Sequence, residues 1–178
     1  MASAARILIP LIAGAAVAVT LGVYGRVHQA TGESVYTGPF SSVFAMKSWL
    51  ATVVAVLAIW QAISALWMYG RLGRRAAPPW VRQAHRITGA FAFLVSVPVA
   101  YSCLWALGFQ DYSPRVLIHS LLGCLLYGVF VTKMLALRLP GVPARFIPVA
   151  GGLVFATVIA LWFTSSWWYF TNVGFPAW

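Results

Sequence analysis

The sequence predicts an all-α, polytopic membrane protein: five transmembrane helices in an up-down bundle that forms a single domain over residues 1–178. Composition is the first reason, because hydrophobic residues make up 62% of the chain and charged residues only 8%, far from the balance of soluble domains. The second reason is that the chain contains five apolar runs of the roughly 20 residues that a helix needs to cross a bilayer. These runs are Ala4–Val27, Val43–Tyr69, Ala84–Phe109, Pro114–Leu137 and Phe146–Phe170.

The first run follows Arg6 and resembles a cleaved signal peptide, since Ala16-Val17-Ala18 has the form of a cleavage site. However, the apolar run continues beyond that site through Tyr24. A signal peptide ends its apolar segment before the cleavage site, so the sequence favours an uncleaved first span.

The connections after the second, third and fourth runs are short and contain helix-ending residues. Pro78-Pro79 precede the third run, Pro114 opens the fourth at a first helical position, and Pro140-Gly141 follow it. The connection 28–42 is longer than these, and we expect it to fold over a site.

The basic residues predict the orientation of the bundle. If successive helices alternate in direction, nine lysine and arginine residues lie at the N-terminal end of the bundle and three at the other end. The positive-inside rule then places the N-terminus in the cytoplasm and the C-terminus outside, with the protein in the plasma membrane. Basic residues beside a membrane bind anionic lipid, so the net charge of +10 requires no nucleic-acid partner. The nine are Arg6, Arg71, Arg74, Arg75, Arg82, Arg86, Lys133, Arg138 and Arg145, and the three are Arg26, Lys47 and Arg115.

Few side chains in the spans carry chemistry. The two carboxylates, Glu33 and Asp111, lie in connections, whereas a proton-coupled transporter normally needs an acid at membrane depth. The two cysteines, Cys103 and Cys124, lie in spans at depths that differ by roughly 9 Å, too far for a disulfide. No pattern predicts a catalytic group, and the three histidines become the main candidates for a site.

Two of the histidines share one pattern, His-x-x-x-Gly. His85 precedes Gly89 in the third run, and His119 precedes Gly123 in the fourth. Positions i and i+4 lie on the same helical face, so each glycine leaves space beside its histidine for a flat macrocycle. Small residues also mark close helix contacts in membranes, and this second interpretation stays open.

The depths of the histidines limit how they can pair. With a 1.5 Å rise per residue and a hydrocarbon core of about 30 Å, His85 and His119 differ in depth by roughly 20 Å, so one haem cannot bridge them. His28, at the end of the first span, lies on the same side as His119 and differs from it by about 9 Å in depth. We therefore predict a haem b near the outer face with His119 and His28 as its iron ligands.

Other residues complete this hypothesis. Arg115 and Lys47 lie near the outer ends of their spans, where they are candidates to pair with haem propionates. His85 would need a separate ligand partner at the inner face, and Met68 and Met134 are candidates.

The segment Asp111-Tyr112-Ser113, followed by His119-Ser120-Leu121-Leu122-Gly123, resembles the histidine helix of cytochrome b561-like membrane proteins. The start of the third run, His85-Arg86-x-x-Gly89, is similar to a span of the broader cytochrome b561 and ferric-reductase-like transmembrane group. The resemblance implies haem b and electron transfer across or into a membrane, usually with four histidines on a four-helix core. This chain has fewer histidines than that pattern, and as a whole it also resembles uncharacterised five-span bacterial membrane proteins.

These observations predict a membrane electron-transfer subunit that binds haem b and exchanges electrons between the quinone pool and an outer-face redox partner. It would serve as the membrane cytochrome b subunit of an oxidoreductase. The alternative is a haem-free accessory or assembly subunit of a larger membrane complex. A small-molecule channel or transporter is the least favoured class, because no broken helix or buried charge is apparent.

Overall fold

The computed structural model describes residues 2–33, 36–73 and 76–175, and all regular structure within these ranges is helical. Five helices are long and apolar enough to cross a membrane, which confirms the predicted helical class and number of spans. Arg74 and Arg75, counted above among the basic residues, and residues 34–35 of the long connection lie outside the described ranges. The elements are α1 (Ala2–Val27), α2 (Val43–Met68), α3 (Pro79–Ser102), α4 (Pro114–Arg138), α5 (Phe146–Trp162) and the short α6 (Trp168–Asn172).

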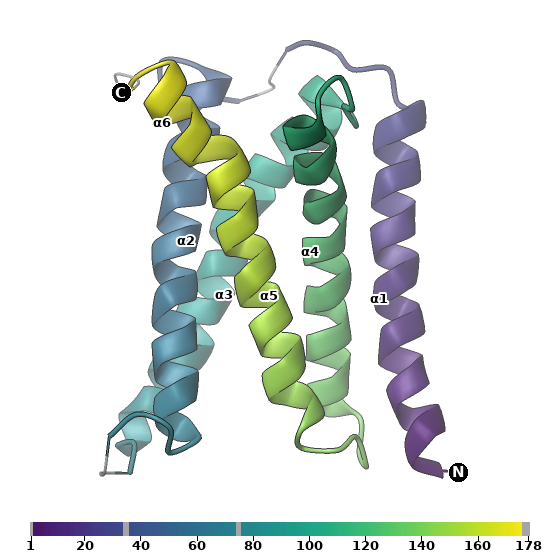
Figure 1. Cartoon of the computed structure of the whole chain (residues 1–178), viewed down its shortest axis with the longest axis vertical. Coiled ribbons are helices and arrows are strands. Elements are labelled where there is room, and N and C mark those ends of the chain that lie inside the picture. Colours follow the sequence, from purple (N-terminus) through teal and green to yellow (C-terminus); the bar gives the residue numbers. More distant parts are fainter. Residues whose placement is uncertain (1, 34–35, 74–75, 176–178) are drawn as a thin grey trace.

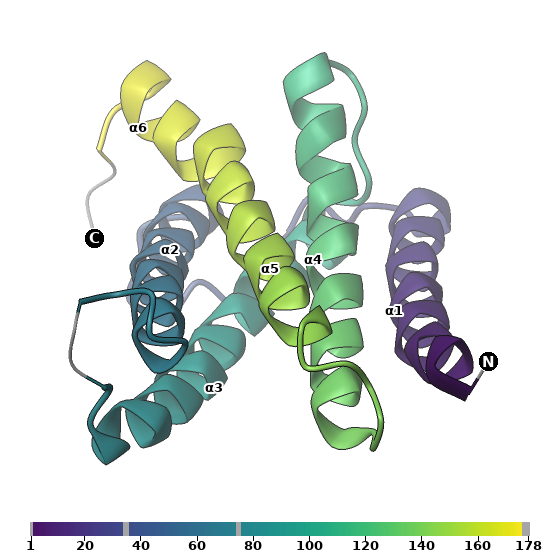
Figure 2. The same cartoon turned by 60° about the horizontal axis from the view of Figure 1, so that its bottom comes forward.

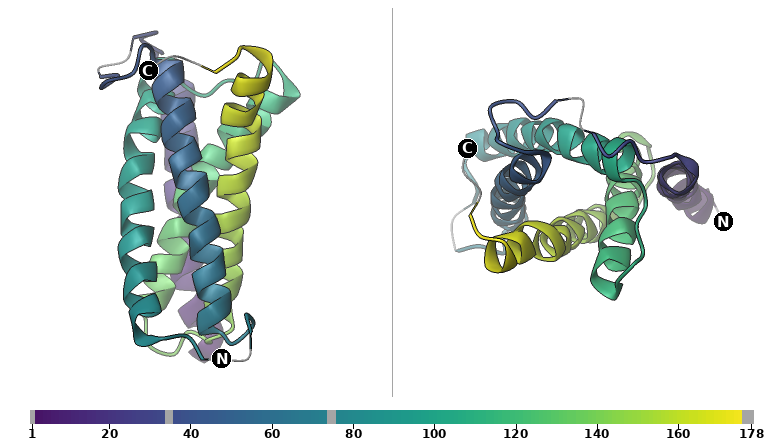
Figure 3. Two further views of the ribbon diagram at one scale, coloured as in Figure 1. Left: turned by 90° about the vertical axis from the view of Figure 1, so that its left-hand side faces the viewer. Right: turned by 90° about the horizontal axis from the view of Figure 1, so that it is seen from above.

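Four of the long helices form a ring, and α1 lies outside it. Viewed along the bundle, α2, α3, α4 and α5 are arranged around a common axis, while α1 packs against α4 (Figure 3). In the tilted view of Figure 2, α4 lies between α5 and α1. Consecutive long helices run in opposite directions (Figure 1). We call the end with α6 and the connection 108–113 the upper end, and the end where α1 begins the lower end.

Glycine brings the backbones of α1 and α4 into contact. A Cβ atom on Gly128 would lie 2.6 Å from the carbonyl oxygen of Gly14, a distance that real side chains do not adopt. Next to this contact, the Thr132 hydroxyl hydrogen-bonds to the Pro10 carbonyl oxygen at 3.0 Å. Close packing at small residues, reinforced by an interhelical hydrogen bond, is the usual basis of helix association in membranes.

Two helices widen near the upper end. α3 continues into the π-helical turn η1 (Cys103–Leu107), and α5 continues into the π-helical turn η2 (Phe163–Trp167). A π-helical turn pairs residues five apart and inserts an extra residue, which rotates the side chains beyond it around the helix. Such turns occur frequently at functional sites. Neither turn was predicted from the sequence.

Side chains close the seam between α3 and α4, whose backbones stay apart. The hydroxyl groups of Ser96 and Tyr127 lie 2.9 Å apart, and the rings of Phe93 and Phe130 stack with their centroids 4.6 Å apart. Across the ring, buried apolar side chains pack at mid-height. The ring is therefore filled at its middle, and the open volume lies above this layer. The packed layer consists of Val54, Ala55, Ala58 and Val158.

Candidate functional site

A cavity of about 420 Å³ lies in the upper half of the ring. Its walls come from α2, from α3 with η1, from α4 and from α5 with η2, and the connection 108–112 lines its upper side. Pockets of about 300–1,000 Å³ with mostly apolar walls and a few polar groups are typical of small-molecule and cofactor sites. The polar side chains in this wall include Lys47, Ser96, Arg115, His119, Tyr127 and Thr164.

His119 lines the cavity with one ring nitrogen already engaged. Its Nδ1 lies 3.0 Å from the Thr164 hydroxyl oxygen on η2. The same hydroxyl lies 2.8 Å from the Ala160 carbonyl oxygen. When it donates to that carbonyl, its oxygen accepts from Nδ1, and Nδ1 carries the ring proton. The other nitrogen, Nε2, then holds a lone pair, and it has no hydrogen-bond partner in the part of the chain that the structure describes.

Two cations flank the upper part of this cavity. The Arg115 guanidinium donates to the Thr164 carbonyl oxygen at 2.6 Å, and its Cζ lies 3.9 Å from the centroid of the Trp168 ring. Lys47 also lines the cavity, with its ammonium group 5.8 Å from the ring centroid of Phe44. Arg115 is therefore fixed by a hydrogen bond and a cation–π contact, and both cations face a site without a carboxylate in its wall.

Gly123, one turn below His119, borders open space. A Cβ atom built on it would meet no atom within 4 Å, although the residue lines the cavity. Cys103 and Cys124 line the same cavity and are both free, in agreement with the prediction that they form no disulfide. The missing side chain of Gly123 thus enlarges the cavity below the imidazole, and helix packing does not require it.

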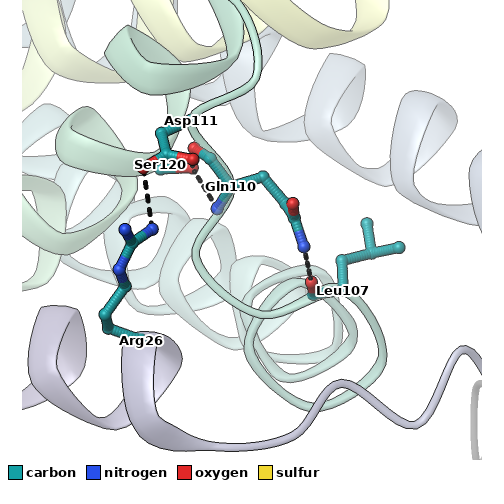
Figure 4. A network of polar contacts seen from close by, with 5 residues as sticks. All are labelled: Arg26, Leu107, Gln110, Asp111 and Ser120. Atoms are coloured by element: carbon teal, nitrogen blue, oxygen red, sulfur yellow. Dashed lines mark hydrogen bonds and ion pairs between the residues drawn. The ribbon is translucent and has the colours of Figure 1, made fainter.

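A polar network holds the connection above the cavity (Figure 4). The Gln110 backbone exchanges two hydrogen bonds with the Ser120 hydroxyl group, which accepts from the amide at 3.3 Å and donates to the carbonyl at 2.9 Å. The Gln110 side chain donates to the Leu107 carbonyl oxygen at 2.6 Å, and Asp111 forms an ion pair with Arg26 of α1 at 2.8 Å. The residue next to His119 therefore anchors the segment that covers it.

His28 does not join His119 at the cavity. Its ring lies between those of Tyr24 and Trp105, with centroids 5.0 and 4.7 Å away, and its Nε2 lies 3.3 Å from the Trp105 carbonyl oxygen. The connection 28–42, expected to fold over a site, contributes none of its described residues to the cavity wall. Its Gly32 amide instead donates to the Ala106 carbonyl oxygen on η1 at 3.0 Å. The segment that covers the cavity is the shorter connection 108–113.

His85 lies in the lower half, in a closely packed polar contact between α2 and α3. Its Nδ1 is 2.7 Å from the Ser64 hydroxyl oxygen, and Gln61 donates to the His85 carbonyl oxygen at 2.9 Å and to Thr88 at 2.7 Å. A Cβ atom on Gly89 would lie 3.0 Å from the Gln61 side-chain oxygen. Gly89 therefore makes room for Gln61, so the space that the sequence assigned to a macrocycle is already filled.

The sequence interpretation missed Thr164, which contacts His119 through its side chain and Arg115 through its backbone. The only signal in the sequence is the run Thr164-Ser165-Ser166 within an apolar span. Within the described ranges, no group of three or more histidine, cysteine or carboxylate side chains is arranged to hold a metal ion on its own.

The comparisons with known proteins give one match. The model of a family of unknown function, DUF6529, matches residues 7–177. No curated protein and no solved structure matches the chain. The family match carries no link to the cytochrome b561-like or ferric-reductase-like group, so that resemblance remains a prediction.

Proposed function

The chain belongs to the DUF6529 family, whose function is unknown, and we propose that it is a membrane electron-transfer subunit with haem b in its upper cavity. The single observation that carries this proposal is the imidazole of His119. Thr164 binds its Nδ1, and its Nε2, at the cavity wall, has no hydrogen-bond partner among the described residues. An imidazole oriented through one nitrogen by a second group is the usual form of a metal-binding histidine.

The surroundings of His119 suit a haem in three further respects. The space beside Gly123 lies on the helical face of His119, where a macrocycle bound through Nε2 needs room. Arg115 and Lys47 supply two positive charges for the two propionates. The remaining wall is largely apolar, which suits the porphyrin ring.

We propose His119 as the single protein ligand to the iron. His28 was the predicted second ligand, but its ring is stacked on Trp105 and its Nε2 is 3.3 Å from a carbonyl oxygen. No other histidine lines the cavity. The haem spectrum should therefore differ from the low-spin spectrum that a pair of histidine ligands would give.

The chain's own residues would then bind and orient the cofactor. Thr164 fixes the tautomer of His119, Arg115 and Lys47 neutralise charge, and the connection held by Ser120 limits the access of water. Haem b supplies one-electron redox chemistry when it is bound. The electrons would pass between the quinone pool and a redox protein at the upper face, as in the membrane cytochrome b subunit of an oxidoreductase.

The proposal includes an orientation in the plasma membrane. Of the ten basic residues within the described ranges, seven belong to the lower end and its connections, so the lower end would face the cytoplasm and the cavity the outside. A periplasmic-type reporter such as alkaline phosphatase, fused after residue 178, should be active. Activity from a cytoplasmic-type reporter fused at the same point would contradict this orientation.

The visible spectrum of the detergent-purified protein tests the cofactor directly. After expression with ample haem, the wild-type protein should show a haem b spectrum, and His119→Ala should abolish it. His85→Ala and His28→Ala are the matched controls and should retain the bands, because neither residue lines the cavity. A colourless wild-type protein would reject the proposal in favour of a haem-free accessory or assembly subunit.

A further inference from the structure

The cations at the two ends of the bundle differ in whether the chain supplies them with partners. At the upper end, Arg26 pairs with a carboxylate, Arg115 donates to a carbonyl oxygen and Lys47 lies over an aromatic ring. At the lower end, no lysine or arginine side chain within the described ranges forms a hydrogen bond or an ion pair. No acidic side chain lies there either, because the only two, Glu33 and Asp111, belong to upper connections. The lower cations therefore take their counter-ions from outside the chain.

Three lower arginines converge on the connection between α4 and α5, which covers residues 139–145. Arg6 of α1 reaches this connection, and a Cβ atom on Gly141 would overlap its guanidinium group. Arg138 ends α4 and Arg145 precedes α5, three and four positions away from Gly141. All three arginines are exposed. We call Arg6, Arg138 and Arg145 the lower arginine site.

The backbone holds this site in a fixed place at the ends of three helices. Pro140 and Pro143 restrict the connection, and the Phe146 amide donates to the Pro143 carbonyl oxygen at 2.9 Å. The contact between Gly14 and Gly128 fixes α1 against α4. In Figure 1 the lower ends of α1, α4 and α5 lie on one side, apart from the connection between α2 and α3. The lower arginine site is therefore separate from the basic residues at the start of α3.

Phosphate is the anion that suits the lower arginine site. A guanidinium group binds phosphate oxygens through paired N–H donors, and three such groups lie at one turn of the chain. α5 begins beside Arg145 without a side-chain cap, so the positive end of its dipole also favours an anion. Five spans of this length place both ends of the bundle at the bilayer surface, where lipid phosphates lie.

We propose that the lower arginine site binds the headgroup of an anionic phospholipid. Zwitterionic lipids also carry a phosphate, but their ammonium group would find positively charged side chains and no acid at this end. The bound headgroup would tie α1, the helix outside the ring, to the connection between α4 and α5. This inference is independent of the proposed function, because no residue of the lower arginine site lines the upper cavity.

Native mass spectrometry of the full-length protein in detergent tests the proposal, after incubation with equal amounts of phosphatidylglycerol and phosphatidylcholine. The wild-type protein should retain phosphatidylglycerol in preference. Arg6→Gln and Arg138→Gln should each lower its affinity about fivefold, the roughly 1 kcal/mol that one arginine contributes near an anionic membrane surface. Arg82→Gln is the matched control, because it removes an exposed arginine from the same end, near the start of α3. It should leave the affinity unchanged.

Inorganic phosphate in large excess distinguishes the two sources of the anion. It should not displace phosphatidylglycerol, because free phosphate lacks the acyl chains that contact apolar helices. Displacement would show that the site takes free phosphate, and it would overturn the lipid as the occupant. Equal losses in Arg6→Gln, Arg138→Gln and Arg82→Gln would also overturn the proposal, since they would indicate an attraction spread over the whole lower end. Equal retention of the two lipids by the wild type would contradict it as well.

Discussion

The two His-x-x-x-Gly segments have the same pattern and opposite surroundings. In both, a hydroxyl group on a neighbouring helix binds the histidine Nδ1: Ser64 for His85, and Thr164 for His119. In both, that hydroxyl also lies within hydrogen-bond distance of a carbonyl oxygen in its own helix, to which it can donate while it accepts from the imidazole. The segments differ in the space beside the glycine, which a side chain fills in the first and a cavity occupies in the second.

The facing helix decides this difference. α2 presents the long amide side chain of Gln61 to Gly89, and that amide is anchored by two hydrogen bonds to α3. No residue of α2, α3 or α5 reaches Gly123 in the same way. A histidine and a glycine on one helical face therefore supply only one wall of a site, which is half of what a site needs. The other half belongs to residues far away in the sequence.

The largest loss of stability should come from placing a side chain at Gly89, where Gln61 already fills the space. Gly89→Leu would place a side chain against Gln61, and it should destabilise the protein by about 3 kcal/mol, through overpacking and the loss of hydrogen bonds. Thermal unfolding in detergent, followed by circular dichroism, measures this. An unfolding midpoint equal to that of the wild type would contradict the tight packing at His85.

The same substitution at Gly123, which borders open space, should have the opposite effect on stability. When both proteins are haem-free, Gly123→Leu should leave the unfolding midpoint unchanged or raised relative to the wild type, because the new side chain enters empty volume. The same side chain occupies the face that the haem needs, so the haem bands of the purified protein should disappear. A Gly123→Leu protein that retains its haem would show that the cofactor does not lie against this helix.

Thr164→Val should have a moderate effect on cofactor binding. The variant keeps the shape of the side chain and removes the acceptor that orients His119. Loss of such an outer partner typically lowers metal affinity about 10- to 100-fold, and haem titration of the apoprotein measures it. Thr157→Val is the control, because the Thr157 hydroxyl bonds within its own helix. Equal affinities for the two variants would exclude Thr164 as the orienting group.

The smallest effect is expected from a substitution at Ser64, whose hydroxyl group binds His85 as that of Thr164 binds His119. Ser64→Ala removes the acceptor for His85 and should cost about 0.6 kcal/mol of stability, the average for interhelical hydrogen bonds in membranes. Haem affinity should not change. A parallel loss of haem would connect the two histidines functionally and would undermine the contrast between them.

The lengths and number of the spans were predictable, because the bilayer imposes them on composition alone. When α5, η2 and α6 are counted as the one span Phe146–Asn172, four of the five predicted runs match the observed spans within about two residues at either end. α3 begins at Pro79, not at Ala84, because the first turn of a helix accepts proline and polar residues that an apolar pattern leaves out. The position of α1 outside the ring could not be predicted, since hydropathy does not say which faces meet.

The candidate site was predictable only as far as His119 and Gly123. Their shared face follows from helical periodicity, whereas the contact with Thr164 spans 45 positions of sequence and depends on how α4 meets α5. The last span also contains Thr157, Ser165 and Ser166, and nothing in the sequence distinguishes Thr164 from them. His28 was misplaced for a related reason. Its ring stacks on Trp105, which lies within η1, and regular helical periodicity does not anticipate a π-helical turn.

The central claim is that His119 is the protein ligand of a haem in the upper cavity. Its most direct test is the visible spectrum of His119→Gly, reconstituted with haem in the absence and presence of imidazole. His85→Gly serves as the matched control. We expect that His119→Gly binds no haem alone, that added imidazole restores a spectrum close to that of the wild type, and that His85→Gly binds haem without imidazole. A His119→Gly protein that shows the wild-type spectrum without imidazole would contradict the claim.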